Sequence, residues 1–135
     1  MKTLDFTIKH MNLLINLIIE YFSFLEENSK ILDSKKINDY RTLIYQIRKD
    51  YIRETEKNSS TISEPIDKIV KEYINLLDRV DTMMKFPADR ALMNIVCVDI
   101  RNLLNTLKKA STSYKLHIET NIDRVMKKID SVCPL

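Results

Sequence analysis

The chain contains no glycine in 135 residues, although average usage of about 7% would place about nine in a chain of this length. Glycine supplies positive φ angles and lets the backbone approach a ligand closely. A phosphate-cradling loop, a dinucleotide-binding turn and a strained nucleophile elbow all need it. The missing glycine therefore excludes these three designs and is consistent with a fold made of helices.

Apolar residues recur along the chain at alternating steps of four and three, which is the spacing of one face of an α-helix. The first seam consists of Leu4, Ile8, Met11, Ile15, Ile18, Phe22 and Leu25. Comparable seams occupy 37–51, 62–83 and 93–114, and the pattern resumes with a shifted phase over 118–132. Helices with such seams pack side by side at shallow angles, as in a coiled coil. We therefore predict an all-α fold, an antiparallel four- to five-helix bundle with heptad-like seams, in one domain over residues 1–135.

Helix-start signals agree with these seams. They are Asp33 or Ser34 as a cap, Thr61 with Glu64 as a capping box, Pro65 in the first turn of the third helix, and Pro87 opening the fourth with Asp89 in its first turn. The expected helices lie near 4–32, 34–57, 61–85, 88–110 and 113–132.

The last stretch of helical pattern is too long for a compact bundle. A single helix over 88–132 would measure about 68 Å at a rise of 1.5 Å per residue. The phase shift and the run Ser111-Thr112-Ser113, whose hydroxyls compete for backbone hydrogen bonds, predict a break there. One continuous final helix that projects beyond the bundle is the alternative.

Composition and charge restrict the partners only weakly. The chain is 44% hydrophobic and 30% charged with three prolines, so it is expected to be ordered and soluble. The net charge of +3 is too small to require nucleic acid or an anionic membrane. Uninterrupted apolar runs are far shorter than the roughly 20 residues that span a bilayer, so no membrane segment is expected.

Two cysteines, Cys97 and Cys133, are too few for a disulfide scaffold. We interpret them as free thiols, Cys97 in the core, of a protein that stays in a reducing, cytoplasmic compartment.

No pattern of catalytic or metal-binding residues is apparent. The chain has no Glu-x-x-His pair for a di-iron bundle and no paired Cys or His spacing for zinc. Cys97 and His117 could meet as nucleophile and base, but no third group is present to orient them. We predict no enzymatic activity, no metal, no cofactor and no small-molecule substrate.

The first helix carries a second apolar seam about 150° from the first at 100° per residue. Its members are Phe6, His10, Leu13, Leu17, Glu20 and Phe24. Two interpretations stand: Phe6, Leu13, Leu17 and Phe24 bind a partner or a second copy, or the helix is central and its own chain covers both seams. Ile95 and Val98, opposite the core seam of the fourth helix, raise the same question.

A basic strip lies on the outer face of the second helix. Arg41, Tyr45, Arg48 and Lys49 are neighbours at helical spacing, and Lys35, Arg53 and Lys57 widen the strip. Such cations can contact phosphates and an exposed tyrosine can stack on a base, so nucleic-acid binding, to RNA or a single strand, is one interpretation. The other is a solvated face whose cations pair with acidic residues of the same helix, namely Asp39, Asp50, Glu54 and Glu56, or of the first helix.

The leading hypothesis is a non-enzymatic protein-interaction module, such as an adaptor, chaperone or inhibitor, that binds a partner or itself through the second seam of the first helix. Nucleic-acid binding through the second helix is the alternative. The sequence identifies neither the partner nor the oligomeric state.

Overall fold

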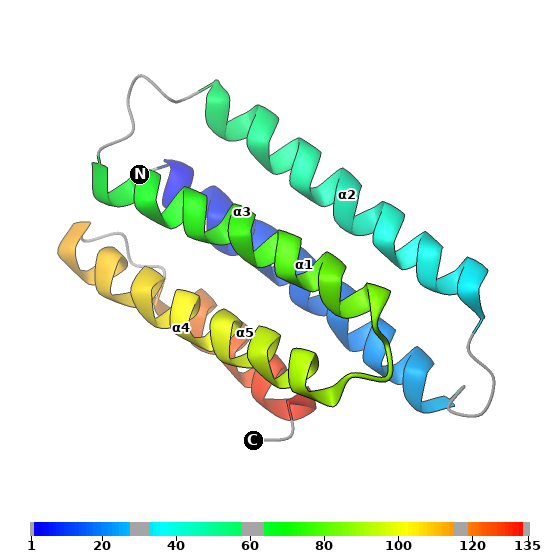
Figure 1. Cartoon of the computed structure of the whole chain (residues 1–135). Helices are drawn as coiled ribbons and strands as arrows, with labels where there is room; N and C mark the ends of the chain where they lie inside the picture. Colours follow the sequence, from blue (N-terminus) through cyan, green and yellow to red (C-terminus); the bar gives the residue numbers. More distant parts are fainter. Residues whose placement is uncertain (1, 28–32, 58–63, 115–118, 134–135) are drawn as a thin grey trace.

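The computed structural model describes residues 2–27, 33–57, 64–114 and 119–133. The described residues form five helices: α1 (Lys2–Glu27), α2 (Ser34–Glu56), α3 (Glu64–Lys85), α4 (Arg90–Tyr114) and α5 (Glu119–Val132). Each helix reverses the direction of the one before it (Figure 1). The prediction of an all-α antiparallel bundle is confirmed.

The helices form a closed ring in which each packs against its neighbours in the chain, and α5 closes the ring against α1. Because the number of alternating helices is odd, α1 and α5 run in the same direction (Figure 1). Helix α1 also contacts α3 and α4 across the ring. It is therefore the helix with the most neighbours, and most residues of its two apolar seams face other parts of the chain.

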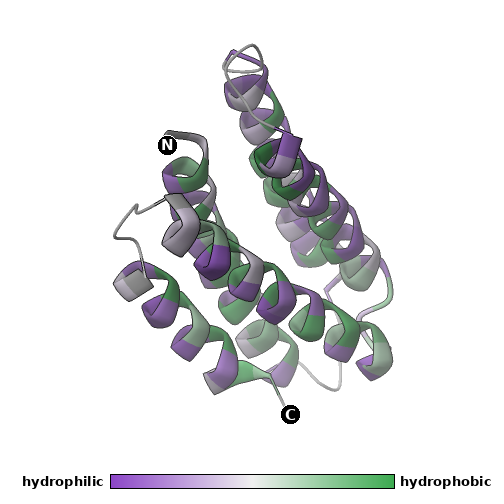
Figure 2. Ribbon diagram, turned by 90° about the vertical axis from the view of Figure 1, so that its left-hand side faces the viewer, coloured by the Kyte–Doolittle hydropathy of each residue, from purple (hydrophilic) through white to green (hydrophobic). Residues whose placement is uncertain are grey.

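One continuous apolar core lies inside this ring. Bands of hydrophilic and hydrophobic residues alternate along every helix, as expected for amphipathic helices (Figure 2). The core members on α1 that are fully covered include Leu4, Met11, Ile15 and Ile18 of the first seam. The seams read from the sequence are thus the packing faces of the bundle.

Side-chain caps fix two helix starts. Asp33 Oδ1 accepts hydrogen bonds from the backbone N–H groups of Lys35 at 3.0 Å and Lys36 at 3.2 Å, so Asp33 caps α2. Asp89 Oδ1 accepts from Ala91 N at 3.0 Å and from Leu92 N at 3.3 Å. The fourth helix therefore begins at Arg90 after an Asp89 cap, slightly later than predicted.

Pro65 lies in the first turn of α3 as expected. Two other predicted boundaries are not tested. The capping residue Thr61 and the predicted end of the first helix over 28–32 lie outside the described residues.

The predicted break at Ser111-Thr112-Ser113 is misplaced, because α4 continues through this run to Tyr114. Thr112 Oγ1 donates to the carbonyl oxygen of Lys108 at 3.1 Å, so this hydroxyl bonds within the helix. The alternative of one continuous final helix is wrong, since α5 folds back onto α4. Ion pairs join the two helices, between Arg101 and Asp130 at 2.7 Å and between Lys108 and Asp123 at 2.8 Å.

A disulfide between Cys97 and Cys133 corrects the expectation of free thiols. Cys97 lies on α4 and Cys133 follows the last residue of α5, with 6.0 Å between their Cα atoms. Both residues are buried. The pair was not expected because the cysteines are 36 residues apart and meet only where α5 returns along α4.

None of the helices described combines the length and the apolarity needed to cross a membrane.

Candidate interaction surface

Helix α2 covers most of the second seam of α1. The ring of Phe6 stacks on that of Tyr51 at 5.7 Å, and the ring of Phe24 lies 5.8 Å from that of Tyr40. Leu17 is buried, with 8% of its surface exposed. For these three candidate partner-binding residues the structure thus favours the second interpretation, a central helix covered by its own chain.

Leu13, the fourth candidate, is 58% exposed and is the apolar member of the seam that remains in water. At 100° per residue it lies at the solvent edge of the strip that faces α2. Leaving a large aliphatic side chain in water forgoes about 1.5 to 3 kcal/mol of burial free energy. Leu13 is therefore the residue of the seam best placed to contact another molecule.

A second leucine extends this exposed edge onto α2. Leu43 is 48% exposed and precedes the seam residue Ile44 by one position, which turns it toward α1 rather than α3. Interpolation between the contacts of Tyr40 with Phe24 and of Tyr51 with Phe6 places Leu43 near the level of Ile19, about 9 Å along the helix axis from Leu13 at 1.5 Å per residue. Sequence reasoning missed Leu43; its exposure depends on how α2 is rotated against α1.

We call the outer edge formed by Leu13, Leu43 and the partly buried residues beside them the α1–α2 surface. The partly buried members, which also pack on the core, are Phe6, Phe24 and Ile47.

Other exposed apolar residues lie apart from this surface. Ile95 is 51% exposed and Val98 is 40% exposed on the outer face of α4, and Phe86 is 57% exposed in the turn between α3 and α4. The question raised for Ile95 and Val98 is therefore answered, since neither is covered by the described part of the chain.

A buried polar cluster joins α1, α2 and α3 beneath Phe6. His10 Nδ1 lies 2.6 Å from Tyr73 Oη, and the Tyr51 and Tyr73 rings meet edge to face at 4.5 Å. The Tyr51 hydroxyl hydrogen-bonds Thr7 Oγ1 at 2.8 Å. Thr7 Oγ1 itself donates to the carbonyl oxygen of Thr3 at 2.7 Å, so Tyr51 is the donor of the first bond.

Burial sets the charge state of this cluster. It lowers the pKa of His10 to about 4, and the nearby Asp50 carboxylate opposes that shift only in part. Burial raises the pKa of Tyr51 to about 12 against the Thr7 hydrogen bond, and it holds the pKa of Tyr73 well above 10. The cluster is therefore neutral near pH 7 and serves to align three helices.

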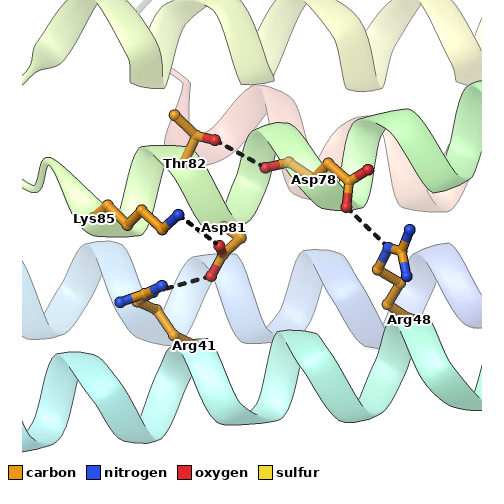
Figure 3. A network of polar contacts seen from close by, with 6 residues as sticks. All are labelled: Arg41, Arg48, Asp78, Asp81, Thr82 and Lys85. Atoms are coloured by element: carbon orange, nitrogen blue, oxygen red, sulfur yellow. Dashed lines mark hydrogen bonds and ion pairs between the residues drawn. The ribbon is translucent and has the colours of Figure 1, made fainter.

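The basic strip of α2 is partly neutralised by α3. Arg41 Nε donates to Asp81 at 3.0 Å and Arg48 Nε donates to Asp78 at 2.8 Å (Figure 3). Lys85 of α3 lies 3.7 Å from the other oxygen of Asp81. The expected pairing within α2 is present for two cations of the strip, because Arg53 pairs with Asp50 at 2.8 Å and Lys57 with Glu54 at 3.6 Å. Arg41 and Arg48 pair with α3 instead.

The other two candidates for nucleic-acid contact, Tyr45 and Lys49, are exposed, Tyr45 by 61%. Tyr45 lines an open groove of about 470 Å³ between α2 and α3, together with Arg41, Arg48, Asp78 and Asp81. Two carboxylates in the same groove repel the phosphates that the arginines would attract. The geometry therefore weakens the case for this strip as a phosphate-binding face.

The described residues contain no group of three or more His, Cys, Asp or Glu side chains placed to hold a metal ion. The hypothetical pair of Cys97 and His117 is not assembled, because Cys97 is bonded to Cys133 and His117 lies outside the described residues.

The fold thus defines an all-α, five-helix bundle in which Leu13 of α1 and Leu43 of α2 are exposed. No protein-family model, no curated protein and no solved structure matches the chain.

Proposed function

We propose that this chain is a non-enzymatic protein-interaction module that binds through the α1–α2 surface. The observation that carries the proposal is the exposure of Leu13, 58%, on a helix whose remaining apolar seam residues pack against other helices. A partner that contacts both Leu13 and Leu43, which is 48% exposed, would exclude water from both side chains.

Within the seam that the sequence suggested, we propose Leu13 as the residue that contacts the partner. Leu17 is a core residue, so a substitution there lowers the stability of the fold and does not report on binding alone. Leu13 and Leu43 can be changed without opening the core, which makes them the residues that report on binding.

Binding is tested with Leu13→Glu against the matched control Ile95→Glu, which places the same charge at a residue of similar exposure on α4. Each tagged protein is used to capture binding partners from its host, and every candidate is then purified and titrated against both variants. We expect Leu13→Glu to weaken binding at least tenfold and Ile95→Glu to leave it unchanged. Equal binding by the wild type and Leu13→Glu, to every partner and to itself, would refute the proposal.

The alternative, nucleic-acid binding through Arg41, Tyr45, Arg48 and Lys49, draws less support because Asp81 and Asp78 engage the two arginines. It predicts binding of a single-stranded oligonucleotide that weakens steeply with salt and with Arg48→Glu. No binding at low salt would remove it.

The cytoplasmic location expected from the sequence loses its argument. It rested on free thiols, whereas Cys97 and Cys133 are bonded. Disulfides persist where the surroundings are oxidising. We therefore propose that the chain meets an oxidant when it folds.

A further inference from the structure

We infer that the occupant of the α1–α2 surface is a second copy of this chain, with the two α1 helices packed antiparallel about a two-fold axis. This inference rests on the proposed function and names its partner. It follows from the distribution of charge and apolar side chains on the exposed face of α1.

Four residues of α1 share that exposed face. Lys9, Leu13, Asn16 and Glu20 lie within about 60° of one another at 100° per residue, and all four are exposed. Lys9 is especially accessible, with 72% of its side chain in solvent, and its ion pair with Asp5 at 3.1 Å is a surface contact. Such a pair is weak enough to exchange partners.

The order of these residues is self-complementary in an antiparallel arrangement. Lys9 and Glu20 lie at equal distances from the point midway between residues 14 and 15, and so do Leu13 and Asn16. A two-fold axis through that point sets Lys9 of each copy opposite Glu20 of the other. An isologous interface thus forms two identical attractive charge pairs, whereas a parallel arrangement would oppose Lys9 to Lys9.

The same axis also accounts for Leu43. It brings Leu13 of one copy level with Asn16 in the other, within about one turn of the level of Leu43 on α2 of that copy. Each Leu13 then fills the space beside the Leu43 of the second copy. Leu13 and Leu43 then cover each other across the dimer interface, so no other partner is needed to remove them from water.

The test is the solution mass of the oxidised protein by sedimentation over a concentration series up to about 1 mM, a range that detects weak dimers. The chain has a mass of 16.0 kDa, so the expected species has twice that mass. Leu13→Glu should abolish the dimer, and Ile95→Glu should retain it. Thermal unfolding of each variant shows that it is folded.

The charge pairs give a sharper test of the arrangement. Lys9→Glu and Glu20→Lys each oppose like charges twice in the dimer, so each should weaken dimerisation about tenfold or more. The double variant restores opposite charges at both positions and should recover wild-type affinity. A structural defect would not be repaired in this way.

The possible outcomes separate a failure of the inferred dimer from a failure of the proposed function on which it rests. A monomer at every concentration overturns the second copy as occupant, yet a partner lost in Leu13→Glu still supports the proposed function. A dimer that survives Leu13→Glu and is lost in Ile95→Glu places self-association on α4 and overturns the inference. If Leu13→Glu disrupts the dimer but the double variant of Lys9→Glu and Glu20→Lys does not recover wild-type affinity, the antiparallel arrangement is overturned.

Discussion

His10 Nδ1 lies 2.6 Å from Tyr73 Oη, and this contact joins α1 to α3 inside the core. Both groups are buried, His10 with 6% of its surface exposed and Tyr73 with none. A neutral imidazole and a neutral phenol can share one hydrogen bond without the desolvation cost of a charge. The core therefore contains a group that acquires a proton more easily in the unfolded chain than in the folded one.

We expect the free energy of unfolding to decrease as the pH falls from about 6.5 to about 4. The pKa of His10 is lowered from 6.5 to about 4 by burial, so in this window the unfolded state binds a proton that the folded state does not. Above pH 6.5 the residue is neutral in both states, and its full contribution is present. The loss over the window amounts to roughly 2 kcal/mol.

Urea unfolding at a series of pH values measures this loss. His10→Phe should flatten the pH dependence between pH 6.5 and 4 while lowering stability at pH 7, because Tyr73 loses its hydrogen-bond partner. His117→Gln removes the other histidine of the sequence and serves as the control. An unchanged slope in His10→Phe would contradict the assignment.

The hydrogen bonds of Thr7 and Tyr51 predict that substitutions at these two residues differ in their cost to stability. Thr7→Val leaves the buried Tyr51 O–H without an acceptor and should cost about 1–3 kcal/mol. Tyr51→Phe leaves Thr7 bonded to the carbonyl of Thr3 and should cost less, about 0.5–1.5 kcal/mol. The double variant should lose less than the sum, as a double-mutant cycle in denaturant would show. Strict additivity would mean that the two hydroxyls do not interact.

Removal of the disulfide should destabilise the bundle. Cys97 and Cys133 close a loop with a sequence separation of 36, for which chain entropy predicts a contribution of about 4 kcal/mol. Cys133→Ala, or the wild type in reductant, should unfold at correspondingly lower denaturant concentration. Identical unfolding curves with and without reductant, after mass spectrometry has shown the oxidised form, would show that the bond contributes no stability.

Leu13 and Leu17 should differ sharply although they are one turn apart. Leu17→Ala removes a buried side chain and should cost about 2–4 kcal/mol of stability. Leu13→Ala changes an exposed residue and should alter monomer stability by less than about 0.5 kcal/mol. Thermal unfolding at a concentration low enough to exclude association distinguishes the two. Similar losses at both positions would place Leu13 in the core.

The ion pairs between α2 and α3 should contribute little and should depend on salt. Asp81→Asn breaks the pair with Arg41 and is expected to cost about 0.5–1 kcal/mol at low salt. In about 1 M salt the difference from the wild type should nearly vanish, because the Debye length falls to about 3 Å. A cost that persists in high salt would indicate a packing role for Asp81 instead.

Apolar periodicity was sufficient to predict the helices and their core faces, because the helical repeat determines which residues share a side. It placed Leu4, Ile8 and Met11 on one face, and all three are buried. Periodicity could not show that Tyr40 of α2 covers Phe24, because contacts between helices depend on how the helices are arranged around one another.

The sequence pattern does not specify how the helices are arranged, and this also explains the other contacts that were missed. The predicted partners for the basic strip lay on its own helix, which holds for Arg53 with Asp50 and for Lys57 with Glu54. Arg48 pairs instead with Asp78, 30 residues away. Cys97 and Cys133 could be paired only by knowing that α5 returns along α4. Leu43 lies one position from a buried residue, so its exposure depends on a rotation of α2 that the sequence pattern does not specify.

The closure of the ring by α5 against α1 has a kinetic consequence. Lys128 of α5 donates to Asn12 of α1 at 2.8 Å across 116 residues of sequence. During synthesis α1 is made before α5, so the side of α1 that faces α5 stays uncovered until α5 follows. Contacts this distant in sequence slow folding, and exposed apolar seams invite aggregation in the meantime. The α1–α5 side is therefore the last part of the bundle to close, and the nascent chain is most vulnerable there.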